Sequence, residues 1–331
     1  MAPRLVVIAG PTAVGKTPVA MALGREIAVE ITCADSRTLY RGMDIGTAKP
    51  TREERERIPH HLIDVARPDE VITLAEYQRL AQRAIDETRA RGRLPLLVGG
   101  TGLYIRAVVD ELQIPPAAPD WRLRATLEAE ERTGGPGTLH RRLSVVDPAA
   151  AARIHPNNVR RIIRALEVHA RTGVPISVHE RSSDRQSSAG AGCGDAEGPV
   201  LMIALTTERA RLYERIRRRI DQHLAAGLVD EVRGLIAAGY ATSLPALQGL
   251  GYKEIVPYLE GRASLEETRA VLQRNTQRYA KRQLTWFRGD GRYRWVEVGD
   301  HPPEVVAARI RAILLEREET PDDPGVSGTG C

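Results

Sequence analysis

The sequence predicts an α/β protein in which a parallel, doubly wound sheet, flanked by helices, carries an all-helical insertion domain. Three observations indicate this fold class. In the N-terminal part, short apolar runs alternate with segments of good helix formers, which is typical of parallel sheets. The first apolar run ends in a loop with two glycines that leads straight into a helix. Nearer the middle of the chain, residues 120–171 contain helical segments only.

The apolar runs of the N-terminal part have the length and composition of buried parallel strands. Strands are expected at residues 5–9, 30–34, 61–65 and 94–98, and helices at 18–27 and 74–91. Pro18 is compatible with the first helix because it falls in the first turn, where an N–H group has no partner inside the helix.

The chain changes character near Pro115 and Pro116. Helices are expected at 121–132, 139–145, 149–154 and 159–172, then strands at 200–205 and 293–298, with helices at 207–226, 228–238, 252–259 and 265–287 between them. The predicted domains are a first core part (1–117), a helical insertion (118–198) ending in a mobile Ser- and Gly-rich loop from residue 182, a second core part with basic helices (199–316) and a disordered tail (317–331).

Composition and charge exclude several classes of protein. No apolar run approaches the ~20 residues of a membrane span, and the N-terminus does not resemble a signal peptide, so we expect a cytoplasmic protein without membrane contact. The cysteines Cys33, Cys193 and Cys331 are scattered, which argues against disulfides and cysteine-based zinc sites. The net charge is +5, and basic residues gather at 209–219 and 274–294. These segments are either a surface for an anionic polymer or solvated helix faces.

Residues 10–17, with the sequence GPTAVGKT, fit the phosphate-loop pattern GxxxxGK[ST] between an apolar strand and a helix. The glycines of this P-loop let several backbone N–H groups point at one anion, and the helix N-terminus adds a favourable dipole. Lys16 supplies a charge to the phosphates, and the Thr17 hydroxyl is a ligand for Mg²⁺. The sequence therefore predicts a P-loop NTPase-like sheet that binds ATP or another di- or triphosphate. The absence of a Walker B pattern argues against a motor or GTPase.

Asp35 follows the second predicted strand, at the sheet edge where ligands of parallel sheets gather. From the residues alone, three interpretations of Asp35 stay open: a helix cap shared with Ser36, a Mg²⁺ ligand of a kinase, or a catalytic carboxylate.

Six segments taken together resemble the tRNA dimethylallyltransferase (tRNA isopentenyltransferase) family of the bacterial type. They are GPTAVGKT at Gly10, ADSRTLYRGMDIGTAKP at Ala34, LLVGGTGLYIRAVVDEL at Leu96, DPAAAARIHPNNVRRIIRALEV at Asp147, ALQGLGYKEIVPYL at Ala246 and QRYAKRQLTWFRGD at Gln277. The resemblance implies a P-loop core with a helical insertion. It also implies transfer of a dimethylallyl group from dimethylallyl diphosphate to the exocyclic amine of adenosine at tRNA position 37, 3′-adjacent to the anticodon. Diphosphate leaves and Mg²⁺ assists.

The resemblance also implies roles for individual residues. Asp35 is then the general base, and Thr101 forms a hydrogen bond near the scissile oxygen. The donor diphosphate is held by Gly10, Pro11, Thr12, Ala13, Val14, Gly15, Lys16, Thr17, Arg209 and Arg215. The anticodon stem-loop is contacted by Asp35, Ser36, Arg37, Thr38, Thr101, Arg124, Arg160, Arg161, Ile162, Ile163 and Arg164.

Several details of this assignment depend on spacing and packing. Because Arg209 and Arg215 are six residues apart, they do not share a helix stripe, and we expect Arg209 to precede the helix. Three neighbouring residues either contact RNA or brace the core: Lys281, Arg282 and Gln283. Trp286 and Phe287 are expected in the core.

Two other functions compete with the transferase. A small-molecule kinase would use ATP in the P-loop and Asp35 to activate a hydroxyl, but it leaves the insertion with Arg160–Arg164 unexplained. A nucleotide-gated RNA-binding module leaves Asp35 and Thr101 without a role. One departure from the family pattern is Thr38–Leu39, where Gln and an aliphatic residue are usual. We expect a monomer.

Overall fold

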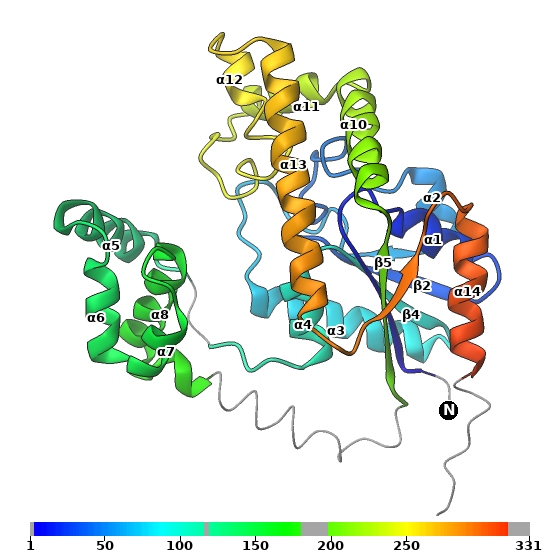
Figure 1. Ribbon diagram of the computed structural model, residues 1–331, viewed down its shortest axis with the longest axis horizontal. Coiled ribbons are helices and arrows are strands. Elements are labelled where there is room, and N and C mark those ends of the chain that lie inside the picture. The colour runs from blue at the N-terminus through cyan, green and yellow to red at the C-terminus, as the bar shows by residue number, and fades with distance from the viewer. Residues whose placement is uncertain (1–2, 116–118, 180–197, 317–331) are drawn as a thin grey trace, which may run out of the picture. The chain divides into compact units, whose positions relative to one another are not determined.

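The computed structural model describes residues 3–115, 119–179 and 198–316 (Figure 1). These residues form two compact units. The first comprises the described parts of Met1–Ile72, Tyr77–Ile105 and Ala196–Cys331, and the second those of Thr73–Glu76 and Arg106–Asp195. The tail from 317 and the loop expected at 182–198, apart from its last residue, lie outside the described residues.

The first unit is built on a parallel sheet, which confirms the predicted fold class. In the described residues its strands are β1 (Leu5–Ala9), β2 (Val29–Ala34), β3 (His60–His61), β4 (Leu94–Gly99), β5 (Val200–Thr206) and β6 (Arg294–Glu297), in the order β3-β2-β4-β1-β5-β6. Every residue of β1 and β2 is buried. Because helices cover both faces of a parallel sheet, its central strands are continuous apolar runs, and such runs are visible in the sequence.

The helices of the sheet-containing part are α1 (Lys16–Leu23), α2 (Arg52–Arg57), α3 (Leu74–Ala90), α4 (Gly102–Val109), α10 (Arg209–Ala225), α11 (Leu228–Ala237), α12 (Val256–Leu259), α13 (Leu265–Arg288) and α14 (Pro303–Glu316). Helices α10 and α13 lie side by side, as do α1 and α14 (Figure 1). Helices α2, α4 and α14 were not expected from the sequence. Helix α2 has no buried residue, so no apolar period marks it, and its signal is the Thr51–Glu54 capping box.

Two expected elements are shorter than predicted. The strand expected at 61–65 is limited to His60–His61, because Leu62 and Asp64 adopt left-handed backbone angles with φ of 63° and 57°. This turn directs the Asp64 carboxylate to Lys49 Nζ at 2.6 Å. The helix expected at 252–259 begins only at Val256, after a series of turns.

The second unit is helical and has a core of its own. Its labelled helices from residue 119 onward are α5 (Trp121–Gly134), α6 (Thr138–Val146), α7 (Pro148–Arg153) and α8 (Val159–Thr172), which confirms the four predicted there. Leu127, Leu143 and Ile162 are among the buried side chains of this core. Asp120 and Asn158 cap the N-termini of α5 and α8 through their side chains. Among the helices that the structure describes, none is long and apolar enough to cross a membrane.

Candidate active site

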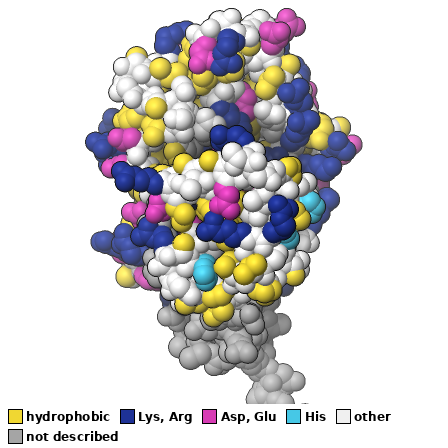
Figure 2. Space-filling model, turned by 90° about the vertical axis from the view of Figure 1, so that its left-hand side faces the viewer, with side chains coloured by type: hydrophobic (Ala, Val, Ile, Leu, Met, Phe, Trp, Pro, Cys, Tyr) yellow, Lys and Arg dark blue, Asp and Glu magenta, His cyan; other side chains and the backbone are white. Residues whose placement is uncertain are grey.

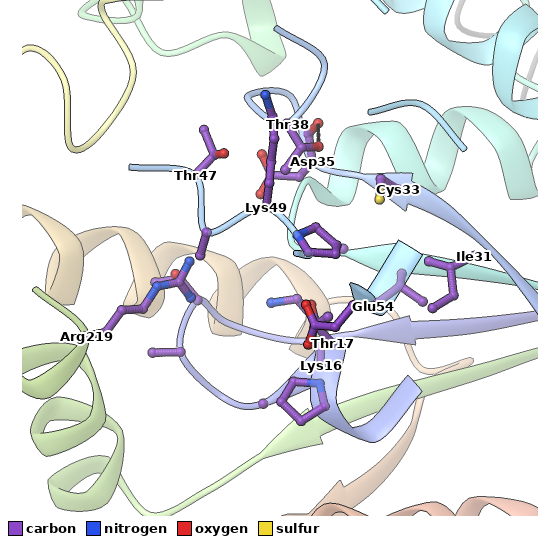
Figure 3. A pocket seen from close by; sticks show the side chains of 18 of the residues that line it. Lys16, Thr17, Ile31, Cys33, Asp35, Thr38, Thr47, Lys49, Glu54 and Arg219 are labelled. Atoms are coloured by element: carbon purple, nitrogen blue, oxygen red, sulfur yellow. Dashed lines mark hydrogen bonds between the residues drawn. The ribbon is translucent and has the colours of Figure 1, made fainter. Parts of the chain in front are cut away.

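A cavity of about 360 Å³ lies at the carboxyl ends of β1, β2 and β4 (Figure 3). Its walls come from the P-loop, the segments after β2, helix α10 and helix α13. The lining residues include Thr12, Ala13, Gly15, Lys16, Thr17, Asp35, Thr38, Lys49, Arg219, Gln222, His223, Tyr279 and Gln283. Because parallel α/β sheets bind ligands at this edge, the cavity is the candidate active site.

The P-loop has a backbone that depends on its glycines. Gly10 has a φ of 149°, and a Cβ atom there would lie 2.8 Å from the Leu205 carbonyl oxygen. Gly15, at the N-cap of α1, has a φ of 104°, which L side chains rarely adopt. These positions place Lys16 and Thr17 in the first turn of α1, at the positive end of the helix dipole. The loop and helix terminus together are suited to an anion.

Lys16 is a cation without an acidic partner among the described residues. Its Nζ donates to the carbonyl oxygens of Gly10 and Pro11, at 3.0 and 2.8 Å. Burial lowers the pKa of Lys16 to about 8, against the opposing effect of the Asp35 carboxylate and with the help of nearby Arg219. Such an amine gains from an anionic ligand, which would replace two neutral acceptors.

Arg219 is a second cation of the same kind, and the sequence-based assignment missed it. Helix α10 directs its guanidinium into the cavity (Figure 3), where it has no hydrogen bond or ion pair to any described residue. Burial lowers the pKa of Arg219, and the Asp35 carboxylate acts in the opposite direction. Because leaving a partly buried charge unpaired costs free energy, the arrangement indicates a site for an anionic ligand.

Asp35 and Thr101 lie next to each other, because their strands β2 and β4 are paired. The Thr101 N–H donates to the Ala34 carbonyl at 3.1 Å, and the Thr101 hydroxyl oxygen accepts from the Ser36 N–H at 3.2 Å. Gly99 makes this approach possible, since a Cβ there would lie 2.0 Å from the Ala34 oxygen. The Asp35 carboxylate lines the cavity and accepts from the Arg37 N–H at 2.8 Å. Thr101 itself is not among the residues that line the cavity.

Helix α13 covers the same loops with three residues spaced at helical intervals. Gln283 bridges the Thr12 N–H and the Gly100 carbonyl, and Trp286 covers Gly102. One turn earlier, Tyr279 lines the cavity, with the side chain of Thr101 nearby. Burial, together with the charge of Asp35, raises the pKa of Tyr279 to about 12, so this phenol keeps its proton near neutral pH.

The two arginines predicted to clamp the diphosphate lie outside the cavity walls. Arg209 is exposed, and it is the first residue of α10 rather than a residue before it. Its Nε donates to the Tyr213 hydroxyl at 3.0 Å. Arg215 donates to the carbonyl oxygens of Val14, at 3.1 Å, and Gly299, at 2.5 Å, so it braces the P-loop backbone. The residue one turn further on, Arg219, is the arginine that reaches the cavity, and the i, i+4 spacing from Arg215 was the available signal.

The DSRT segment after β2 is held by internal hydrogen bonds. The Arg37 guanidinium donates to the Pro245 carbonyl at 2.5 Å, and the Thr38 hydroxyl donates to the Asp35 carbonyl at 3.2 Å. Thr38 is buried and lines the cavity. Of the aromatic pair in α13, Phe287 is buried as expected, whereas Trp286 is 47% exposed and not in the core. Trp286 packs against Gly102, where a Cβ atom would lie 2.1 Å from Trp286 Nε1.

The residues predicted to contact tRNA from the helical unit have three different environments. Arg160 and Arg161 are exposed at the start of α8. The side chains of Ile162 and Ile163 are buried in the helical core, which corrects their assignment as RNA-contacting side chains. They follow the apolar stripe of an amphipathic helix and so face inward.

Arg124 and Arg164 share one carboxylate, that of the fully buried Glu167. Arg124 Nη2 and Arg164 Nη1 lie 2.8 and 2.7 Å from Glu167 Oε2. Burial works to raise the pKa of Glu167, but hydrogen bonds from Arg124, the Asp120 N–H and Arg164 lower it to about 2. These two arginines therefore stabilise the helical unit.

The chain is similar in sequence and structure to known proteins of one family. The model of the family described as IPP transferase matches residues 38–290. A tRNA dimethylallyltransferase from Symbiobacterium thermophilum is 51% identical over 317 residues, which are 96% of each chain. The solved structure of the full-length tRNA isopentenylpyrophosphate transferase from Bacillus halodurans is 43% identical, with a TM-score of 0.67, and covers 95% of this chain and 98% of its own. A eukaryotic dimethylallyltransferase acting on tRNA is 25% identical, with a TM-score of 0.73, over 95% of this chain and 78% of its own.

Proposed function

Since the chain belongs to the IPP transferase family, we propose that its cavity transfers a dimethylallyl group from dimethylallyl diphosphate to the exocyclic amine of adenosine 37 in tRNA. The observation that carries this proposal is the composition of the cavity. Lys16 and Arg219, two cations without an acidic partner among the described residues, share it with Asp35. A diphosphate supplies the missing negative charge, and a carboxylate is the base that an amine acceptor needs.

The P-loop and Arg219 bind the diphosphate of the donor. As the allylic C–O bond breaks, negative charge grows on the departing oxygen. Groups already directed at that oxygen lower the barrier without having to reorganise. The Lys16 ammonium, the Arg219 guanidinium and the N-terminus of α1 are in place for this, because all three already contribute to the cavity before a ligand arrives.

Asp35 acts on the acceptor. The adenine amine is a weak nucleophile because its lone pair is delocalised into the ring. A carboxylate that accepts a hydrogen bond from this amine orients the nitrogen and takes its proton as the N–C bond forms. Thr101 does not line the cavity, and its hydroxyl accepts from the Ser36 N–H, so it supports the segment that carries Asp35.

Magnesium fits the donor end of the cavity. The Thr17 hydroxyl lines the cavity and has no hydrogen bond to another described residue, so its oxygen is available as a ligand. The described residues contain no group of three or more His, Cys, Asp or Glu side chains that would hold a metal. Mg²⁺ at phosphates usually takes only one or two protein oxygens and keeps several waters, which matches this single hydroxyl. When bound, it neutralises charge on the diphosphate.

The enzyme acts as a monomer in the cytoplasm. It binds tRNA through the anticodon stem-loop. The reacting base must leave the loop to reach Asp35. Arg160 and Arg161, both exposed, are suited to phosphate contacts. Figure 2 shows one face of the molecule with many Lys and Arg side chains and fewer acidic ones. The alternative function, a small-molecule kinase, is not supported by the family or the relatives.

The test is incubation of the protein with prenyl-labelled dimethylallyl diphosphate, Mg²⁺ and unmodified tRNA with adenosine at position 37. Label in the tRNA, lost when position 37 is changed to guanosine, is the expected result. No label in tRNA, together with ATP consumption in the presence of a small acceptor, would overturn the proposal in favour of a kinase.

A further inference from the structure

Gln283 connects two loops that come from different strands. Its Oε1 accepts from the Thr12 N–H of the P-loop at 2.8 Å, and its Nε2 donates to the Gly100 carbonyl at 2.8 Å. The first loop follows β1 and the second follows β4. The side chain is 5% exposed, and it comes from α13, far from both loops in the sequence. One amide group thus joins the donor-binding loop to the turn that carries Thr101.

The fit around Gln283 is tight and specific. A Cβ atom at Gly100 would lie 2.2 Å from Gln283 Nε2, so a side chain at position 100 would break the bridge. The bridge needs an acceptor at one end and a donor at the other, and a primary amide offers both in one plane. A carboxylate would satisfy the Thr12 N–H but would repel the Gly100 oxygen. An apolar side chain would leave both backbone groups without this partner.

Given the proposed function, we infer that Gln283 is a positioning residue, which sets the distance between the P-loop and the Gly99–Gly102 turn. The two loops act on opposite ends of the same reaction. The P-loop holds the leaving diphosphate, whereas the turn holds Thr101 next to Asp35. Transfer requires the allylic carbon to lie between them in line, and a shift of about 1 Å costs roughly 10²-fold in rate. Both polar ends of Gln283 are already bonded to backbone, so it acts through the loops.

The experiment uses Gln283→Met and Gln283→Glu in the full chain, with single-turnover transfer to tRNA as the readout. For Gln283→Met we expect a rate roughly 10²-fold lower, with the donor and tRNA concentrations at half-maximal rate changed less than about threefold. A lower rate at nearly unchanged half-maximal concentrations indicates misaligned loops and not the loss of either binding site. Thermal unfolding of each variant shows whether its fold is retained.

Gln283→Glu provides a readout that packing alone does not produce. A protonated glutamic acid has the same donor and acceptor arrangement as the amide, and burial raises a glutamate pKa toward neutrality. The ratio of the variant rate to the wild-type rate is therefore expected to rise at least tenfold as the pH falls from 8 to 6. The matched control is Gln273→Glu on the same helix, which does not line the cavity and whose ratio should stay flat.

Three outcomes distinguish the alternatives. A rising ratio for Gln283→Glu, with a flat control, supports the inference. A flat ratio for Gln283→Glu in a folded variant, or a Gln283→Met rate within threefold of wild type, overturns it and leaves the proposed function intact. A wild-type chain that transfers no label overturns the proposed function itself, and the inference with it.

Discussion

Two clusters of basic residues, one in the cavity of the sheet unit and one in the helical unit, use positive charge in opposite ways. In the cavity, Lys16 and Arg219 have no acidic partner among the described residues. In the helical unit, Arg124 and Arg164 both bind Glu167, which is completely buried. The cavity cluster lacks a bound counterion, whereas the cluster in the helical unit has the Glu167 carboxylate as its counterion.

This difference separates residues that await a ligand from residues that hold the fold together. A desolvated cation without a counterion costs free energy, so it persists where a ligand provides the opposite charge. A cation bound to a buried carboxylate already has its counterion. Removing either partner leaves the other without its hydrogen bonds, which lowers the free energy of unfolding. A matching arginine in a family motif therefore does not by itself indicate contact with substrate. The environment of its guanidinium decides.

The largest effect is expected from removing the Asp35 carboxylate, which lines the cavity together with Lys16 and Arg219. Asp35→Asn keeps the shape of the side chain but cannot take the proton of the amine. We expect a transfer rate 10²- to 10⁴-fold lower, the usual contribution of a general base. Binding of tRNA, measured by filter retention, should change less than threefold.

The exposed Asp86 on α3 supplies the control for this prediction, because Asp86→Asn removes the same charge from a residue that does not line the cavity. Near-normal transfer by Asp35→Asn would remove Asp35 from the mechanism.

The second-largest effect is expected from removing the positive charge of Arg219. Arg219→Met should lower the transfer rate about 10²- to 10³-fold, because a charge aimed at the leaving diphosphate is lost. Its neighbour Arg218 pairs with Glu214 on the exposed side of α10, and Arg218→Met should stay within about threefold of wild type. Equal losses in the two variants would mean that general charge on α10, and not the cavity, binds the donor.

The pH dependence tests Lys16. Its pKa is lowered to about 8, so the free enzyme carries this charge below pH 8 and loses it above. The value of kcat/KM for the donor should therefore fall about tenfold per pH unit above pH 8. In Lys16→Met the remaining activity should lack this decline. A decline that persists in Lys16→Met would assign it to another group.

The smallest effect on transfer is expected from a change in the helical unit, where Glu167 binds Arg124 and Arg164. Glu167→Gln should lower the free energy of unfolding by about 2 kcal/mol at pH 7, the worth of hydrogen bonds to charged groups. The folded pKa, about 2, is below the ordinary 4.5, so this stability is present above pH 4.5 and is lost as the pH falls toward 2.

Urea unfolding should therefore show that the difference in free energy of unfolding between wild type and Glu167→Gln becomes smaller below pH 4.5. The rate of transfer at saturating tRNA should stay within about threefold. A large loss of rate without loss of stability would place Glu167 and its arginines in the reaction.

The sequence was a good guide where the signal is local. The strand limits of β1, β2 and β4, the P-loop and the strand-end position of Asp35 all follow from short apolar runs and the residues that end them. It did not identify Arg219 or Tyr279, and it left open whether Gln283 contacts RNA or braces the core. These residues come from helices α10 and α13, and which face of a helix covers a sheet edge is decided by packing between elements far apart in the chain.

The central claim, that the cavity cations hold a leaving group and not a group to be transferred, is tested most directly with a doubly labelled donor. Dimethylallyl diphosphate with ¹⁴C in the prenyl chain and ³²P in the diphosphate is incubated with the protein, Mg²⁺ and tRNA in a single turnover. We expect all transferred ¹⁴C in the tRNA and an equal amount of ³²P as free diphosphate. ³²P in the tRNA, or free diphosphate released without ¹⁴C in the tRNA, would contradict the claim.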